Sequence, residues 1–241
     1  MREAYLDCFT FVHRTYQPYY RLARTIAEWS GDTNKILDLG SGGAEHVFAL
    51  LQAYKKLGIA PPQFVLSDLY PNVDAYAKLQ KKFGDNAVTY INYPVSALNI
   101  EGTDIRYWSI FTAFHHFAPA DARQLLQQLF LKGDGLCILE YTQRSVYQLV
   151  MMICGFPLLL LVPFFARKFR LRKMLFTTII PVIPLMAIFD GIVSILRSYT
   201  KEEILALMPP DSRDAFHVDY KEVMWRFAPL KATMFMLKRK H

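Results

Sequence analysis

The order of apolar segments between Lys35 and Tyr141 constrains the fold of this chain more than any other feature of its 241 residues. Short runs with the composition of strands alternate there with longer segments whose apolar residues recur at helical spacing. We expect strands in KILDLG, QFVLSDL, VTYINY, YWSIFTAF and GLCILEY, and helices in AEHVFALLQAYKKLG, VDAYAKLQKKF and PADARQLLQQLFLKG. Such alternation builds a mostly parallel sheet with helices on both faces. The predicted fold class is therefore α/β, with a doubly wound sheet.

The segments on either side of this alternation are expected to complete the same domain. YYRLARTIAEW, within residues 1–30, has apolar residues at helical spacing and predicts a helix that caps the sheet. Thr200 followed by Glu203 forms a capping box, which predicts the start of a short helix. AFHVDYKEVMWRF and ATMFMLKRK then predict two closing strands that pair antiparallel.

Two long apolar runs interrupt the pattern and predict an inserted helical hairpin. The run from Val146 to Ala166 has no charge, and the run from Met174 to Leu196 has only Asp190. At about 1.5 Å per residue, either run could reach the roughly 30 Å of a bilayer core. Asp190 is expected near the membrane interface, with a polar contact to a substrate as the alternative. We divide the chain into a core over 1–145, the hairpin over 146–199 and the completion of the core over 200–241.

The loop between the apolar runs, RKFRLRK, indicates how the hairpin meets a membrane. Two full crossings would carry its five positive charges to the far side, against the tendency of short basic loops to stay inside. Prolines also interrupt both runs and favour bent or re-entrant helices; these are Pro157, Pro163, Pro181 and Pro184. We expect a hairpin that enters one cytoplasmic leaflet, with its loop among anionic headgroups, and two full spans remain the alternative.

Charge and cysteine content narrow the possible partners. The net charge of +7 favours an anionic neighbour, either acidic lipid or nucleic acid. Because five of the positive charges lie in the hairpin loop, we expect anionic lipids and no nucleic acid. Cys8, Cys137 and Cys154 have neither metal-ligand spacing nor an even number, so no metal site or disulfide framework is expected. Charges interrupt the N-terminal segment, which therefore lacks the apolar core of a secretory signal, and the catalytic part is expected on the cytoplasmic side.

The segment KILDLGSGGAEHV joins the first predicted strand to a helix through a glycine-rich turn. Asp38 stands near the end of the strand, and Gly40, Ser41 and Gly42 follow it. Glycines permit a tight turn there and let a ligand approach the backbone at the helix N-terminus. Asp68, at the end of the next strand, stands where nucleotide-binding α/β units place a ribose-binding carboxylate. The two strand ends together predict a nucleotide-type cofactor site.

These residues resemble the first motifs of the class I (Rossmann-like) S-adenosylmethionine-dependent methyltransferases. The resemblance covers residues 33–145 and 200–241. It implies that the loop from Asp38 to Gly42 binds the amino acid part of S-adenosyl-L-methionine. It also implies that Asp68 bonds both ribose hydroxyls and that Leu69 lies beside the adenine. The sequence departs from the family after the third strand, where Asn92 and Ser96 replace an acidic residue that holds the adenine amino group.

The family motif that follows the fourth strand is matched by TAFHHF at residues 112–117. The resemblance implies cofactor contacts at Thr112 and Phe114 and places His115 and His116 at the edge of the cofactor. Methyl transfer is an in-line displacement, so the protein mainly aligns donor and acceptor and removes a proton where one must leave. Histidine can accept a proton near neutral pH, which makes His115 or His116 the candidate general base. The alternative is a hydrogen bond at a helix start, or packing under the sheet.

Glu140 and Arg144 follow the fifth predicted strand, at the edge where open α/β sheets bind ligands. They could orient an acceptor or close an ion pair. A hydrophobic hairpin beside this edge favours an acceptor that enters from the lipid, such as a quinone-like ring, an alkylated phenol or a lipid intermediate. We therefore expect a methyltransferase that acts at a membrane surface on a small hydrophobic or lipid-like acceptor.

Other interpretations of the same features stay open. A glycine loop also occurs as a tight turn without a ligand, or beside a nicotinamide cofactor, although Glu45 stands where the third glycine of the dinucleotide fingerprint would be. The chain could be a membrane-attached adaptor that keeps the fold without the reaction. A nucleic-acid methyltransferase is a third possibility, but no Asn-Pro-Pro-Tyr motif follows the fourth strand.

Overall fold

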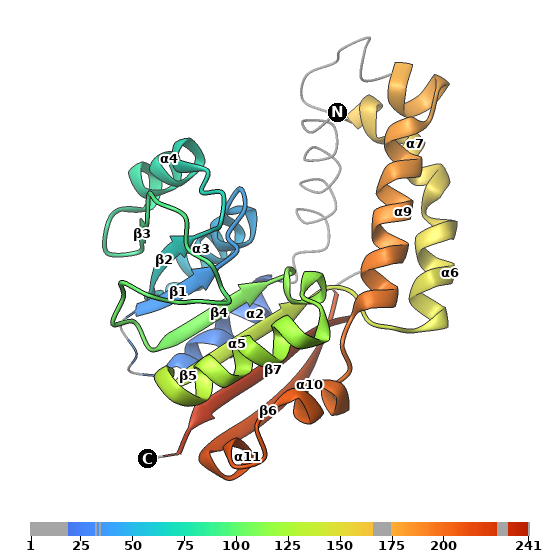
Figure 1. The fold of residues 1–241 in the computed structure, drawn as a ribbon. Helices are drawn as coiled ribbons and strands as arrows, with labels where there is room; N and C mark the ends of the chain where they lie inside the picture. Colours follow the sequence, from blue (N-terminus) through green and yellow to red (C-terminus); the bar gives the residue numbers. More distant parts are fainter. Residues whose placement is uncertain (1–18, 32, 34, 166–174, 226–230, 241) are drawn as a thin grey trace.

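A computed structural model describes residues 19–31, 33, 35–165, 175–225 and 231–240 (Figure 1). These residues form a seven-stranded sheet in the order β3-β2-β1-β4-β5-β7-β6. β1 to β5 are parallel, and β7 runs antiparallel to both β5 and β6. The strands are β1 (Lys35–Leu39), β2 (Gln63–Ser67), β3 (Val88–Tyr90), β4 (Tyr107–Phe111), β5 (Gly135–Glu140), β6 (Phe216–Met224) and β7 (Lys231–Arg239). The predicted fold class is confirmed, including the terminal antiparallel pair.

Different helices cover the two faces of the sheet. One face carries α2 (Tyr19–Ser30), α3 (Glu45–Leu57) and α4 (Val73–Phe83). The other carries α5 (Pro119–Lys132) and α10 (Lys201–Leu207). Successive strand residues point to opposite faces, so in β1 Ile36 packs with the first group and Leu37 with the second. Two short elements complete the domain, the 3₁₀ turn η1 (Phe114–His116) and α11 (Ser212–Ala215).

The start of α10 and the end of β3 were both predicted from local sequence. The capping box of α10 is present, because the Thr200 hydroxyl accepts from the Glu203 amide and the Glu203 carboxylate accepts from the Thr200 amide. The third strand is shorter than expected and ends at Tyr90 rather than Tyr93. The Ile91 amide still donates to the Leu66 carbonyl at 2.9 Å, and farther along Pro94 has no amide hydrogen with which to extend the ladder.

The hydrophobic hairpin forms an arm that extends away from the sheet (Figure 1). The arm consists of α6 (Val146–Cys154), α7 (Phe156–Phe165), the π-helical turn η2 (Leu175–Ile179) and α9 (Val182–Arg197). Two of its helices begin at a proline, with Pro157 in the first turn of α7 and Pro181 at the N-cap of α9, whereas α6 begins after Ser145. Proline suits such positions because the first amide groups of a helix have no helical partner. The predicted basic loop at 167–173 lies outside the described residues, as do Cys8 and the rest of residues 1–18.

Among the described residues, no single helix is both long and apolar enough to cross a bilayer. α9 and α10 reach that length and composition only as a pair, and they are bent by 60° at the break between them. Within the arm, helix boundaries coincide with Pro157 and Pro181, whereas Pro163 and Pro184 lie inside α7 and α9.

Candidate functional site

Asp38 is a buried residue near the end of β1, just before the glycine-rich turn. Its carboxylate accepts from the Ser41 hydroxyl at 2.6 Å and from the Ser109 hydroxyl of β4 at 2.8 Å. The Ser67 hydroxyl of β2 donates to the Asp38 carbonyl at 2.8 Å. Burial raises the pKa of Asp38 to about 7, although the two serine hydroxyls act to lower it. Asp38 thus joins three strands under the glycine loop.

The loop above Asp38 requires glycine at two positions. Gly40 has φ of 70° and Gly42 has φ of 54°, a region that side chains rarely adopt. A side chain built at Gly42 would meet no atom within 4 Å, so the loop is open on that side. The Gly42 amide donates to Asp68 Oδ2 at 2.8 Å, and the Tyr70 amide donates to Asp68 Oδ1 at 2.8 Å. Asp68 is therefore fixed, half-buried, next to the open side of the loop.

A cavity of about 490 Å³ lies beyond Asp68, between the segments that follow β2 and β3. Leu69 is 49% exposed and lines it. Other lining residues are Tyr93, Val95, Ser96, Asn99 and Glu101. Ser96 thus lies near the predicted adenine contact, whereas Asn92 does not line this cavity. Sequence reasoning missed Glu101, an acid five positions after Ser96 in the same loop.

Thr112, directly after β4, has a strained backbone. Its φ of 53° is unusual for a residue that is not glycine and costs on the order of 1–3 kcal/mol. Two hydrogen bonds hold it there: its amide donates to the Leu139 carbonyl at 2.7 Å, and its hydroxyl bonds His46 Nε2 at 2.7 Å. The next residue, Ala113, has its Cβ 3.7 Å from where a side chain on Gly40 would begin. Thr112 therefore directly precedes Ala113, the residue after β4 that approaches Gly40 of the glycine loop.

His46, which sequence reasoning did not single out, bonds the strained Thr112. It lies in the first turn of α3, and its Nδ1 bonds the Tyr19 hydroxyl at 3.0 Å while its Nε2 bonds Thr112. Burial lowers the pKa of His46 to about 4, so the imidazole is neutral at neutral pH. The sequence signal that could have pointed to His46 is its position three residues after Gly43, the last glycine of the loop.

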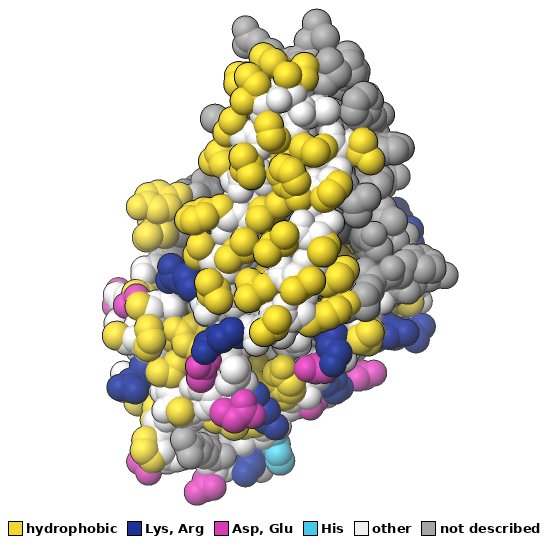
Figure 2. Space-filling model, turned by 90° about the vertical axis from the view of Figure 1, so that its right-hand side faces the viewer, with side chains coloured by type: hydrophobic (Ala, Val, Ile, Leu, Met, Phe, Trp, Pro, Cys, Tyr) yellow, Lys and Arg dark blue, Asp and Glu magenta, His cyan; other side chains and the backbone are white. Residues whose placement is uncertain are grey.

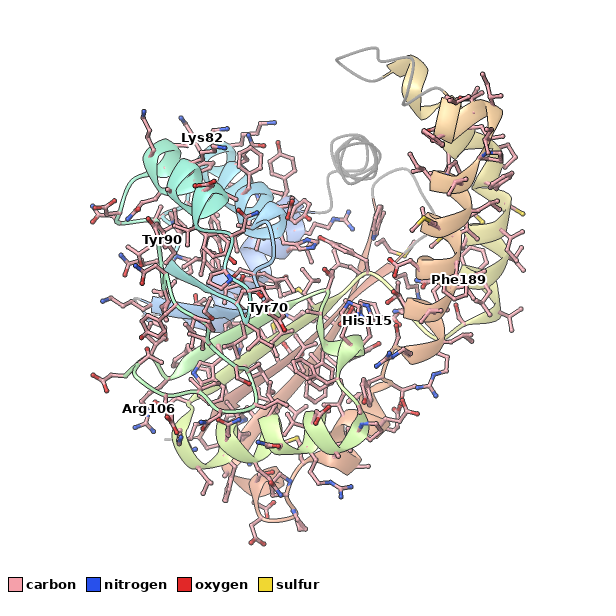
Figure 3. All side chains as sticks on the ribbon, turned by 45° about the horizontal axis from the view of Figure 1, so that its top comes forward. Tyr70, Lys82, Tyr90, Arg106, His115 and Phe189 are labelled. Carbon is pink, nitrogen blue, oxygen red and sulfur yellow. The ribbon has the colours of Figure 1, made fainter. Side chains whose placement is uncertain are left out.

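His115 and Glu140 form a buried pair at the carboxyl ends of β4 and β5. His115 Nδ1 lies 2.8 Å from Glu140 Oε2, and the His115 amide donates to Glu140 Oε1 at 3.1 Å. The residues are 6% and 7% exposed. Because a carboxylate accepts hydrogen bonds, Nδ1 is the ring nitrogen that donates, and in a neutral ring Nε2 then keeps its lone pair. Figure 3 shows His115 on the turn after β4, on the side of the sheet that faces α9.

The other predicted residues of this edge have different surroundings. His116 is exposed, its ring centre lies 4.3 Å from that of His115, and partial burial together with the neighbouring His115 lowers its pKa. Phe114 is buried and packs its ring against Tyr199. Arg144 makes a two-pronged ion pair with Glu203, with atoms 2.7 and 2.9 Å apart. The structure thus brings His115, His116 and Glu140 together, while Arg144 is engaged with α10.

The arm beside this edge exposes apolar side chains along its length. Figure 2 shows one face of the arm covered by hydrophobic side chains, with charged groups gathered below it on the sheet domain. Val146 is 77% exposed, Ile153 57% and Phe189 71%. Asp190 is the one charged side chain among the described residues from Val146 to Leu196.

No protein-family model matches the sequence, and the comparison with curated proteins found no match. Solved structures do match its fold. The magnesium protoporphyrin IX methyltransferase from Synechocystis PCC 6803, determined with bound SAH, has a TM-score of 0.53 and 12% identity, with 95% of this chain and 88% of that chain covered. An O-methyltransferase family protein from Burkholderia thailandensis has a TM-score of 0.55 and 14% identity. The match covers 97% of this chain but only 59% of the Burkholderia protein.

The methyltransferase domain of a bacterial Hen1, CtHen1-C, also matches, with a TM-score of 0.52 and 12% identity. That match covers 92% of this chain and 98% of the domain. The chain therefore has the class I S-adenosylmethionine-dependent methyltransferase fold, as the sequence resemblance implied.

Proposed function

We propose that this chain is an S-adenosyl-L-methionine-dependent methyltransferase that acts at a membrane surface on a small hydrophobic or lipid-like acceptor. One observation carries the proposal. The open glycine loop with Asp68 and the His115–Glu140 pair lie at the same edge of a methyltransferase-type sheet. A cofactor loop and an oriented base on one edge suit methyl transfer, because the reaction depends on alignment and on removal of one proton.

The residues at the loop fit the proposed cofactor. The backbone at Gly42 is open to a ligand, and Asp68 is fixed where a carboxylate can accept from ribose hydroxyls. The cavity beside Leu69 offers an apolar wall with Ser96 and Glu101 as polar groups for an adenine. When bound, S-adenosyl-L-methionine supplies an electrophilic methyl group on a sulfonium.

His115 is the proposed general base. Its Nε2 lone pair can take a proton from an acceptor hydroxyl or amine, while Nδ1–H stays bonded to Glu140. The carboxylate fixes the tautomer and stabilises the imidazolium that forms. Burial of the pair keeps water from the shared hydrogen bond.

The arm supports the membrane part of the proposal, and its proposed partner is one leaflet of an anionic bilayer. Apolar side chains this exposed are costly in water. Arg144 and Arg197 flank the apolar segment at its base, and the loop RKFRLRK lies at its other end in sequence. Each positive charge near an anionic surface contributes about 1 kcal/mol. The sheet domain would then lie on the cytoplasmic side, with the acceptor entering from the lipid.

Calorimetric titration of S-adenosyl-L-methionine into detergent-purified protein tests the proposal. We expect saturable binding that Asp68→Ala abolishes and Asp85→Ala preserves, since Asp85 is an exposed acid just before β3, at the opposite edge of the sheet. Binding would justify a screen of quinone-like, phenolic and lipid acceptors with labelled cofactor. A well-folded wild type that does not bind would instead favour the membrane-attached adaptor.

A further inference from the structure

Arg197, the last residue of α9, and Tyr199, two positions later, contact the turn that carries the histidines. Arg197 Nη2 donates to the His116 carbonyl at 2.8 Å. The Tyr199 hydroxyl donates to the Phe117 carbonyl at 2.8 Å. The arm's exit segment, Arg197 to Tyr199, therefore holds two successive carbonyl groups at the end of η1.

The same exit segment also contacts the chain that follows β5. Ser198 is 1% exposed, and its hydroxyl shares a hydrogen bond of 2.7 Å with the Thr142 hydroxyl. Arg144 Nη2 donates to the Ser198 carbonyl at 2.8 Å. The segment thus joins the loop after β4 to the loop after β5.

His115 lies in the loop after β4, and Glu140 is the last residue of β5, directly before the second loop. We propose that Arg197 and Tyr199 are positioning residues that hold His115 Nδ1 against Glu140. This inference rests on the proposed function, because it assigns the exit segment to the base of the same reaction. It also gives the arm a role in the site besides membrane contact.

His115 needs such support because η1, the turn that carries it, is short. η1 has three residues and follows the strained Thr112, so its own hydrogen bonds are few. A displacement of about 1 Å would lengthen the 2.8 Å bond between Nδ1 and Oε2 beyond hydrogen-bonding range. The two carbonyl contacts from Arg197 and Tyr199 restrict that displacement.

Nuclear magnetic resonance of full-length protein with isotope-labelled histidine tests the assignment in detergent micelles, without an acceptor. A proton shared with a buried carboxylate exchanges slowly, so wild type should show a downfield Nδ1–H signal, which Glu140→Gln assigns by shifting or removing it. We expect loss of this signal in the Arg197→Ala/Tyr199→Phe double variant. Arg197→Lys keeps a donor toward the His116 carbonyl and should retain the signal.

Arg123→Ala is the matched control, because Arg123 is an exposed arginine on α5, away from the exit segment. Thermal unfolding checks that each variant folds. If the double variant does not fold, Tyr199→Phe alone, which removes only one oxygen atom, replaces it in the test. Retention of the signal in the double variant, or in Tyr199→Phe where that variant is used, would overturn the inference, as would its absence from wild type. Cofactor titration in the same samples reports separately on the proposed function.

Discussion

Asp38 and His46 are buried ionisable residues whose pKa values are shifted in opposite directions. The pKa of Asp38 rises from 3.8 to about 7, so the folded state holds a proton that the unfolded chain releases, and stability is lost as pH rises through this range. The pKa of His46 falls from 6.5 to about 4, so its contribution to stability is lost as pH falls through that range. Between pH 4 and 6.5 the two trends oppose each other.

Asp38→Asn and His46→Gln should therefore change the pH dependence of stability with opposite signs. From about pH 4.5 to about pH 6.5, the unfolding free energy of Asp38→Asn relative to wild type should rise by up to about 1.4 kcal/mol per pH unit. The corresponding difference for His46→Gln should fall. Urea unfolding at the two pH values measures both slopes, and slopes of the same sign would contradict the assignment.

Glu140 should affect catalysis without affecting the cofactor. Glu140→Gln removes the charge that fixes the His115 tautomer and stabilises its protonated form. We expect kcat to fall by about 10²-fold, the low end of what a positioned base contributes. The Kd of S-adenosyl-L-methionine should not change, because Asp68 and the glycine loop are untouched. Single-turnover assays with the first acceptor identified, run beside calorimetry, check both values, and a loss of cofactor affinity instead would argue for a structural role.

Local sequence pattern predicted most of the strands of the sheet and most of its helices. Apolar periodicity and glycine turns are local signals, and they located all five parallel strands and placed Asp38 and Asp68 at strand ends. His46 and Glu101 were missed because their roles come from contacts between elements distant in sequence. The contact of Arg197 with η1 spans 81 positions, and no local pattern indicates it.

The arm's apolar surface should determine membrane binding. Ile153→Asp and Phe189→Asp place a charge on exposed positions of α6 and α9, which would be costly to bury in lipid. We expect both variants to bind anionic vesicles at least about tenfold more weakly than wild type, since burying one large apolar side chain contributes about 1.5–3 kcal/mol. Leu131→Asp is the matched control, because Leu131 is 73% exposed but lies on α5. Vesicle flotation measures the effect, and equal losses in all three variants would show that the arm is not the docking surface.

The arm adds little to the hydrophobic core of the sheet domain. Both core clusters are built from strands and from helices outside the arm, with Ile195 near its exit among the few buried apolar side chains of α9. The chain enters and leaves the arm at its base, where α6 and α9 pack side by side. Packed helices lie about 8–10 Å apart, a distance that a few residues can span.

Replacing residues 146–194 by a short Gly-Ser linker should therefore leave a folded domain that still contains the exit segment. We expect cofactor affinity like that of wild type and complete loss of vesicle binding, because the glycine loop and Asp68 lie outside the arm. Circular dichroism measures folding, calorimetry measures cofactor affinity and flotation measures vesicle binding, all on one preparation. The control protein carries the same linker inserted at residues 211–214, away from the arm. If the shortened protein unfolded while the control insertion folded, the arm would be part of the domain's structural core rather than a separate membrane-binding element.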